Sequence, residues 1–230
     1  MKRLAALLAG LAALLTGLAP APDALAQANA GYRLGTRTCD GYPRLPIGMA
    51  DGMCAGLVYA VPGSARPAAA PVFPRTVMEL PGGDVLVVAM GGWQAGIGSV
   101  WRFSGRPGRA VPPRRLLYGL AMPHQAAIGP DGRVYVGEST RIIRFDPDAP
   151  SPQATIETVL TGLPGSHRDD SRHPLSHFIF DADGSLILNA GAPTDQCDDP
   201  APAPGRRCGE GTGPQASAAL WRYAYLGNGR

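Results

Sequence analysis

The sequence lacks a second long hydrophobic run and lacks a dense basic surface pattern. After the apolar run at residues 4–19, no segment approaches the ~20 residues that a helix needs to cross a bilayer. The formal net charge of +3 is carried mostly by arginines scattered through predicted loops, without a Lys/Arg run interleaved with aromatic residues. These absences argue against a protein with several membrane spans and against a nucleic-acid-binding surface.

Cysteine is scarce, and its spacing is informative. The chain has four cysteines, with neither C-x-x-C spacing nor clustered histidines beside them, which disfavours a metal site. The C-x-x-C-H pattern is absent, which excludes a fused cytochrome c in this chain. Two local pairs surrounded by Gly, Pro and Asp favour disulfides in an exported protein. We therefore predict the bonds Cys39–Cys54 and Cys197–Cys208.

Residues 1–26 have the features of a secretory signal peptide. Two basic residues precede the apolar run, and an A-x-A cleavage pattern ends at Ala26. We expect cleavage after Ala26 or Ala30, a periplasmic or secreted location, and a soluble mature protein without further membrane contact. An uncleaved membrane anchor is the alternative, although the run is short for a span.

Three segments share a turn followed by a strand of alternating apolar residues. They are LPGGDVLVV (80–88), GPDGRVYVG (129–137) and DADGSLILN (181–189). Asp-Gly or Gly-Gly supplies the positive φ that a tight hairpin needs. If Gly83, Gly132 and Gly184 are equivalent, the repeat intervals are 49 and 52 residues.

Further strand patterns flank each turn. Upstream lie PRTVMEL (74–80), PHQAAIG (123–129) and LSHFIFD (175–181), and downstream lie SVWRFS (99–104), RIIRFD (141–146) and ALWRYA (219–224). The downstream strands share an apolar, Arg, aromatic core. Helical periodicity is not sustained anywhere after residue 31. A repeat of about 50 residues built from such strands is typical of one β-propeller blade.

The sequence therefore predicts an all-β fold, a β-propeller in which residues 74–230 form about three four-stranded blades. Residues 31–73 are expected to be an irregular N-terminal segment. Propellers generally have four to eight blades, so three predict an incomplete ring and a truncated protein or fragment. The alternatives are a complete small protein with an irregular extra blade from the N-terminal segment, or two chains that pair their open edges.

Two of the blades carry a resemblance to a known family. The runs GLAMPHQAAIGPDGRVYVGES (119–139) and FDADGSLILNAGAP (180–193), with the blade spacing, resemble the glucose/sorbosone dehydrogenases. These are exported quinoproteins that bind pyrroloquinoline quinone (PQQ) and calcium on a six-bladed propeller. The resemblance covers roughly residues 74–225 and implies the N-terminal half of such an enzyme. It further implies a sugar substrate and an external electron acceptor.

The resemblance implies that His173 is the catalytic general base. A family histidine about ten residues ahead of the turn aspartate, here Asp183, takes the sugar hydroxyl proton as hydride passes to the quinone. An imidazole suits this role because its pKa lies near neutrality. The family's acidic partner is replaced here by Ala192, and the nearest carboxylate is Asp195. This departure fits the sorbosone-type branch better than the glucose-type branch.

Five further residues are predicted to contact substrate or cofactor near the channel. They are His124, Gln125, Trp93, Arg172 and His177. Glycines around Trp93 permit close approach of a ligand, and Arg172 would meet the quinone carboxylates. The competing interpretation is structural: the histidines cap or pack, and Arg172 belongs to a solvated loop. No metal ligands are predicted, since D-Q-C-D-D at 195–199 lacks the spacing of a calcium loop.

Two other function classes remain open from the residues. A calcium-dependent lactonase-like propeller would need acidic and amide side chains in the channel, for which Glu138 and Asn189 are the candidates. A non-catalytic binding propeller is favoured by the lack of a complete catalytic set. The family's calcium ligands and cationic clamps for PQQ lie in later blades that this sequence does not contain, so the chain alone is expected to be inactive.

Overall fold

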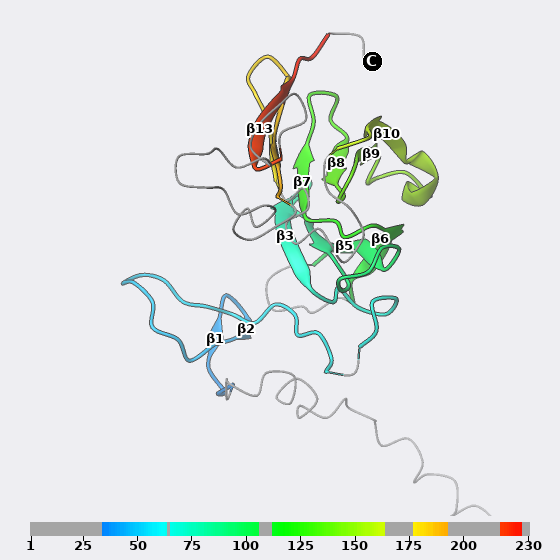
Figure 1. Cartoon of the computed structure of the whole chain (residues 1–230). Helices are drawn as coiled ribbons and strands as arrows, with labels where there is room; N and C mark the ends of the chain where they lie inside the picture. The colour runs from blue at the N-terminus through cyan, green and yellow to red at the C-terminus, as the bar shows by residue number, and fades with distance from the viewer. Residues whose placement is uncertain (1–33, 64, 106–111, 164–176, 193–216, 227–230) are drawn as a thin grey trace, which may run out of the picture. The chain divides into compact units, whose positions relative to one another are not determined.

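The structure is a computed structural model that describes residues 34–63, 65–105, 112–163, 177–192 and 217–226 (Figure 1). Its regular structure is β, apart from the short 3-10 turn η1 at Pro152–Thr155. None of the helical structure in these ranges is long and apolar enough to span a bilayer. The chain divides into two compact units, Met1–Gly63 and Ser64–Arg230. The predicted all-β class is confirmed.

Among the described residues of the first unit, a short hairpin, an isolated bridge between Arg44 and Gly56, and a disulfide hold the chain together. Strand β1 (Thr38–Cys39) pairs antiparallel with β2 (Tyr42–Pro43). Cys39 is bonded to Cys54, with their Cα atoms 5.8 Å apart, which confirms the first predicted pair. The bond cross-links a unit that has little other regular structure, and it stabilises this unit mainly by restricting the unfolded chain.

The second unit contains three antiparallel sheets in chain order. The first has β3 (Pro74–Glu79), β4 (Val85–Ala89), β5 (Gly98–Phe103) and β6 (Arg114–Leu120). The second has β7 (Gln125–Ile128), β8 (Val134–Gly137), β9 (Ile142–Phe145) and β10 (Glu157–Leu160). The third has β11 (Phe178–Phe180), β12 (Leu186–Ala190) and β13 (Ala219–Tyr223).

Each sheet is an up-and-down meander, because its strands are neighbours in the same order as in the sequence. Successive meanders packed face to face are the blades of a β-propeller. The predicted four strands are present in the first two blades. The third blade has three strands within the residues that the structure describes.

The first hairpin of every blade is the same turn. Gly83, Gly132 and Gly184 have φ angles of 83°, 76° and 82°. Each glycine amide donates to the carbonyl three residues earlier, at N···O distances of 2.8, 3.0 and 2.9 Å. A three-residue loop that ends in a left-handed residue needs this conformation, which side chains disfavour. The predicted repeat is thereby confirmed.

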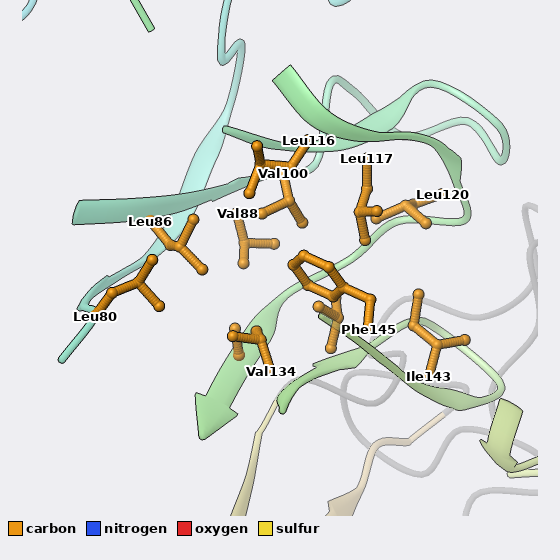
Figure 2. Close-up of a cluster of buried hydrophobic side chains, with 12 residues drawn as sticks. Leu80, Leu86, Val88, Val100, Leu116, Leu117, Leu120, Val134, Ile143 and Phe145 are labelled. Carbon is orange, nitrogen blue, oxygen red and sulfur yellow. The ribbon is translucent and has the colours of Figure 1, made fainter. Parts of the chain in front are cut away.

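Apolar side chains fill the space between neighbouring blades. Between the first two blades, Phe145 lies among side chains that include Val88, Val100 and Leu117 (Figure 2). A second cluster, which includes the buried Phe178, joins the second blade to the third. Each fully buried side chain of this kind contributes about 1.5–3 kcal/mol. The blades are therefore stabilised mainly by their neighbours, as in other repeat architectures.

The arginine of the apolar, Arg, aromatic pattern forms an ion pair with the hairpin turn of its own blade. The N···O distances are 2.5 Å for Arg102–Asp84, 3.0 Å for Arg144–Asp131 and 2.6 Å for Arg222–Asp183. Each aspartate is adjacent to its turn glycine. Partly exposed ion pairs of this kind add little to stability. Their main effect is to fix the third strand relative to the turn.

Candidate functional site

The first strand of each blade lies where the blades meet. Strand β7 contacts both β3 and β11 (Figure 1). The first strand of each blade therefore lies beside the first strand of the next, as the inner strands of a propeller do. Thr76, Gln125 and His177 occupy the same register position, opposite Val88, Gly137 and Asn189. The starts of the three strands therefore bring side chains from different blades to one end.

A side chain of the first blade binds the second blade at this end. The Thr76 hydroxyl donates to the His124 backbone carbonyl at 2.5 Å. The same oxygen lies 3.0 Å from Gln125 Oε1. Gln125 is half-buried and takes part in the contact between blades. Its predicted role in ligand binding stays a prediction.

His124 is half-buried, and the structure defines its tautomer. Nδ1 lies 2.8 Å from the Met122 carbonyl oxygen. A carbonyl can only accept, so Nδ1 carries the hydrogen and Nε2 keeps a lone pair. Burial chiefly lowers the pKa of His124 below its ordinary 6.5, and the charges of Arg75 and His177 lower it further, against the Met122 contact. At neutral pH, His124 is therefore a neutral imidazole with a basic Nε2.

The backbone at Met122 holds this carbonyl in place. Met122 has a φ of 46°, a left-handed conformation that is uncommon for a residue with a side chain. Its side chain is buried, which fixes the bend between β6 and β7. This role could not be predicted from the sequence, because a methionine does not indicate positive φ.

Arg75 and Trp93 form a second part of the site. The Arg75 guanidinium lies over the Trp93 ring, 5.4 Å from its centroid. Trp93 is 61% exposed, so most of the indole is available to a ligand. None of the carboxylates in the described ranges forms an ion pair with Arg75; its Nη2 contacts Met90 Sδ at 3.5 Å. Comparison of the strand starts across blades would have identified Arg75, since it precedes Thr76 as His124 precedes Gln125.

The loop that presents Trp93 depends on glycine. Gly91, Gly92 and Gly96 have φ angles of 79°, 151° and 84°. At Gly91 a Cβ would lie 2.5 Å from the Ile97 carbonyl oxygen. A chain with side chains at these positions could not fold back in this way, so the glycines expose the indole.

His177 directly precedes β11 on the third blade and is exposed. Its backbone N–H donates to Asn189 Oδ1 at 2.7 Å, and its carbonyl accepts from the Asn189 N–H at 3.0 Å. Asn189 thus orders the start of β11 with its side-chain oxygen.

Glu138, the other candidate of a lactonase-like site, has a structural environment. It is fully buried, and its carboxylate forms an ion pair with Arg141. Its other oxygen accepts from the Ala121 backbone N–H at 2.5 Å. Both carboxylate oxygens are therefore engaged inside the protein. This arrangement argues against Glu138 as a metal ligand in a channel.

Several predicted residues lie outside the described residues. They are His173, Arg172, Cys197 and Cys208, together with the signal peptide. Their proposed roles stay predictions. Within the described part of the chain, no group of three or more His, Cys, Asp or Glu could hold a metal ion.

Comparison with known proteins gives matches only among solved structures. No family model matches the chain, and no curated protein matches it. The calcium structure of Trichoderma reesei Carbohydrate-Active Enzymes Family AA12 has a TM-score of 0.42 and 18% identity, covering 57% of this chain and 33% of that one. PQQ-bound aldose sugar dehydrogenase from Streptomyces coelicolor has a TM-score of 0.41 and 23% identity, covering 67% and 52%.

Another similar structure is that of virginiamycin B lyase from Staphylococcus aureus. It has a TM-score of 0.39 and 16% identity, and the alignment covers 60% of this chain and 39% of that one. The chain thus spans between a third and about half of the length of these proteins. One fold hosts many activities, so the chemistry has to be argued from the site.

Proposed function

We propose that this chain forms part of an exported PQQ-dependent sugar dehydrogenase, with the substrate mouth at the starts of the inner strands. The observation that carries the proposal is the meeting of two strand starts from successive blades. The backbone carbonyl of the half-buried His124 accepts from Thr76, and Arg75, the residue before Thr76, lies over the exposed Trp93 ring. The sequence resemblance to the glucose/sorbosone dehydrogenases supports the same chemistry. The finer assignment to the sorbosone-type branch rests on Ala192 at the position of the family's acid.

The described residues fit one of the two implied cofactors. PQQ is a planar polycarboxylate, and Arg75 with the exposed face of Trp93 offers a cation beside a flat aromatic surface. Calcium needs six to eight oxygen ligands, and the described part of the chain contains no acidic cluster of the required kind. The described residues therefore do not fit a calcium site.

The residues of this chain would bind the sugar and move a proton. When bound, PQQ supplies the acceptor for the hydride of the oxidised sugar carbon. The Nε2 lone pair of His124 can accept a hydrogen bond from a sugar hydroxyl and orient it. Removal of the hydroxyl proton is assigned to His173 by the resemblance.

Cofactor binding tests the proposal apart from turnover. We would titrate the chain with PQQ and follow the quinone absorbance and the Trp fluorescence. Arg75→Ala should weaken binding about tenfold or more, since it removes a charge-assisted contact. Arg114→Ala on β6 is the matched control, because it removes an exposed arginine from a different strand. Absence of saturable PQQ binding, or equal binding by Arg75→Ala, would contradict the proposal.

Turnover tests the roles of the histidines. Longer forms of the protein that contain further blades would be assayed for dye reduction with a panel of aldoses, PQQ and calcium. His173→Ala should lower kcat by about 10²-fold or more, as expected for a general base. His124→Gln should mainly raise KM, because it removes a substrate contact. If His173→Ala keeps full activity, the general-base assignment is wrong.

A further inference from the structure

A cleft of about 320 Å³ lies between the second and third blades. It is lined by residues of the hairpin turns, such as Asp131 and Gly184, and by the nearby parts of β8, β10 and β13. The turns are at the opposite end of the blades from His124. The cleft is therefore separate from the proposed redox site, and its size is within the ~300–1,000 Å³ of small-molecule pockets.

One wall of the cleft is aromatic. Tyr135 and Phe180 pack edge to face with ring centroids 4.9 Å apart, which joins the two blades beneath the cleft. Tyr223 is partly buried beside them. Tyr225 is 46% exposed, so one large ring of this wall is available to a ligand.

Tyr225 is held in a defined position. Its backbone N–H donates to Ser185 Oγ at 3.1 Å. Its ring lies against Gly184, where a Cβ would approach Tyr225 Cδ1 to 3.1 Å. The turn glycine of the third blade thus leaves room for the ring as well as adopting positive φ. An aromatic surface that is already ordered costs less entropy on binding than a mobile one.

The other wall is polar, and its charges balance. Arg144 donates to Glu157 Oε2 at 2.7 Å and to Asp131 Oδ2 at 3.0 Å. Arg133, which lies beside the cleft, donates to Glu157 Oε1 at 2.5 Å. Two guanidinium groups therefore face two carboxylates. Such a wall offers fixed donors and acceptors side by side without a net charge that would select an ion.

We propose that this cleft binds a neutral sugar unit of an oligosaccharide. The C–H face of a sugar ring can pack on the exposed Tyr225 ring, as apolar groups pack on other aromatic faces. Its neighbouring hydroxyls both donate and accept, which matches paired carboxylate and guanidinium groups. A cationic ligand would find both carboxylates already paired, and an apolar peptide would remove the paired charges from water without replacing the lost hydration.

The experiment measures binding to the whole chain by calorimetry, with ligand-observed NMR as a second method. The probes are maltotriose, cellotriose, xylotriose and mannotriose, with trigalacturonate as a charged comparison. Two variants test the cleft: Tyr225→Ala removes the exposed ring, and Thr158→Trp fills the cleft from β10. Tyr118→Ala is the matched control, since Tyr118 is 53% exposed on the first blade.

We expect saturable binding of at least one neutral trisaccharide. Tyr225→Ala and Thr158→Trp should each weaken it about tenfold or more, whereas Tyr118→Ala should leave it within about twofold. Thermal melts that match the unaltered protein would show that the variants are folded. Binding of none of the neutral probes, tighter binding of trigalacturonate, or binding by Tyr225→Ala and Thr158→Trp as tight as that of the unaltered protein would overturn the proposal. Because the readout is binding at the turn end, it is independent of PQQ and turnover.

Discussion

The hydroxyl of Thr76 donates a 2.5 Å hydrogen bond to the backbone carbonyl of His124. The two residues belong to successive blades, so one side chain connects their inner strands directly. The accepting residue is also the neutral histidine of the candidate site. Packing between the first two blades and the position of His124 are therefore coupled.

Replacing Thr76 by valine tests this connection. The variant keeps the shape of the side chain but leaves the partly buried His124 carbonyl without this donor. The free energy of unfolding should fall by about 1–2 kcal/mol. Urea denaturation at pH 7 would measure it. Thr158→Val, on the exposed edge of β10, is the control and should change it by less than about 0.5 kcal/mol; equal effects at both sites would contradict the assignment.

The turn glycines should differ in how they tolerate alanine. Gly132→Ala should cost about 1 kcal/mol or more, because its φ is 76° while no atom lies within 4 Å of the new Cβ. Gly184→Ala should cost more, since its Cβ also meets the Tyr225 ring. Thermal or urea unfolding would rank the two. Gly82→Ala is the control, because Gly82 has open space and no positive φ.

The pH dependence of stability should report the buried imidazole. The folded-state pKa of His124 is below its unfolded value of 6.5, chiefly through burial. The folded protein therefore binds fewer protons than the unfolded chain between the two values. Well above pH 6.5, the stability does not depend on the protonation of this group. As the pH falls from 6.5 to the folded pKa, the free energy of unfolding decreases by no more than about 1.4 kcal/mol per pH unit.

The loss should be smaller in His124→Gln, compared at each pH by urea denaturation. The NMR titration of the His124 ring should have its midpoint below 6.5. Arg75→Ala should move that midpoint upward, since the guanidinium charge is one of its causes. A midpoint at or above 6.5 in the unaltered protein would show that the ring is not desolvated.

Glu138 should be required for folding rather than for chemistry. Glu138→Ala removes the buried acceptor of the Ala121 N–H and leaves Arg141 without its partner. The loss of stability should be about 2–4 kcal/mol, less than for a fully buried pair because Arg141 is partly exposed. Glu138→Gln keeps an acceptor and should cost less. Equal losses in the two variants, measured by urea unfolding, would contradict this interpretation.

The blades could be predicted because each turn has a local cause. Gly83, Gly132 and Gly184 combine positive φ with flanking apolar alternation, and both features are visible in the sequence. The outer strand β6 was harder to locate. Its sequence RRLLYGL places two arginines and two leucines in pairs, and this order does not give the alternation of a half-buried strand.

The candidate site was predictable only in part. His124 and Trp93 stood out as a histidine and a tryptophan next to a proline or glycines. Arg75 did not stand out in the sequence, because an arginine at a strand start is ordinarily a solvated charge. Its place in the candidate site depends on its contact with the Trp93 ring and on the effect of its charge on the pKa of His124. The role of Met122 depends on a backbone angle and a carbonyl, which residue type does not reveal.

The arginine that reaches from the third strand of each blade to its hairpin turn has an evolutionary consequence. In each of the three blades, the ion pair is made by two residues of the same repeat. The arginines are Arg102, Arg144 and Arg222, and each pairs with an aspartate of its own hairpin turn, so both partners are copied when the repeat is duplicated. A gene duplication that adds one repeat would therefore add a blade that already contains this ion pair. Substitutions in the loops that connect the blades would change the surface of the protein and leave these ion pairs intact.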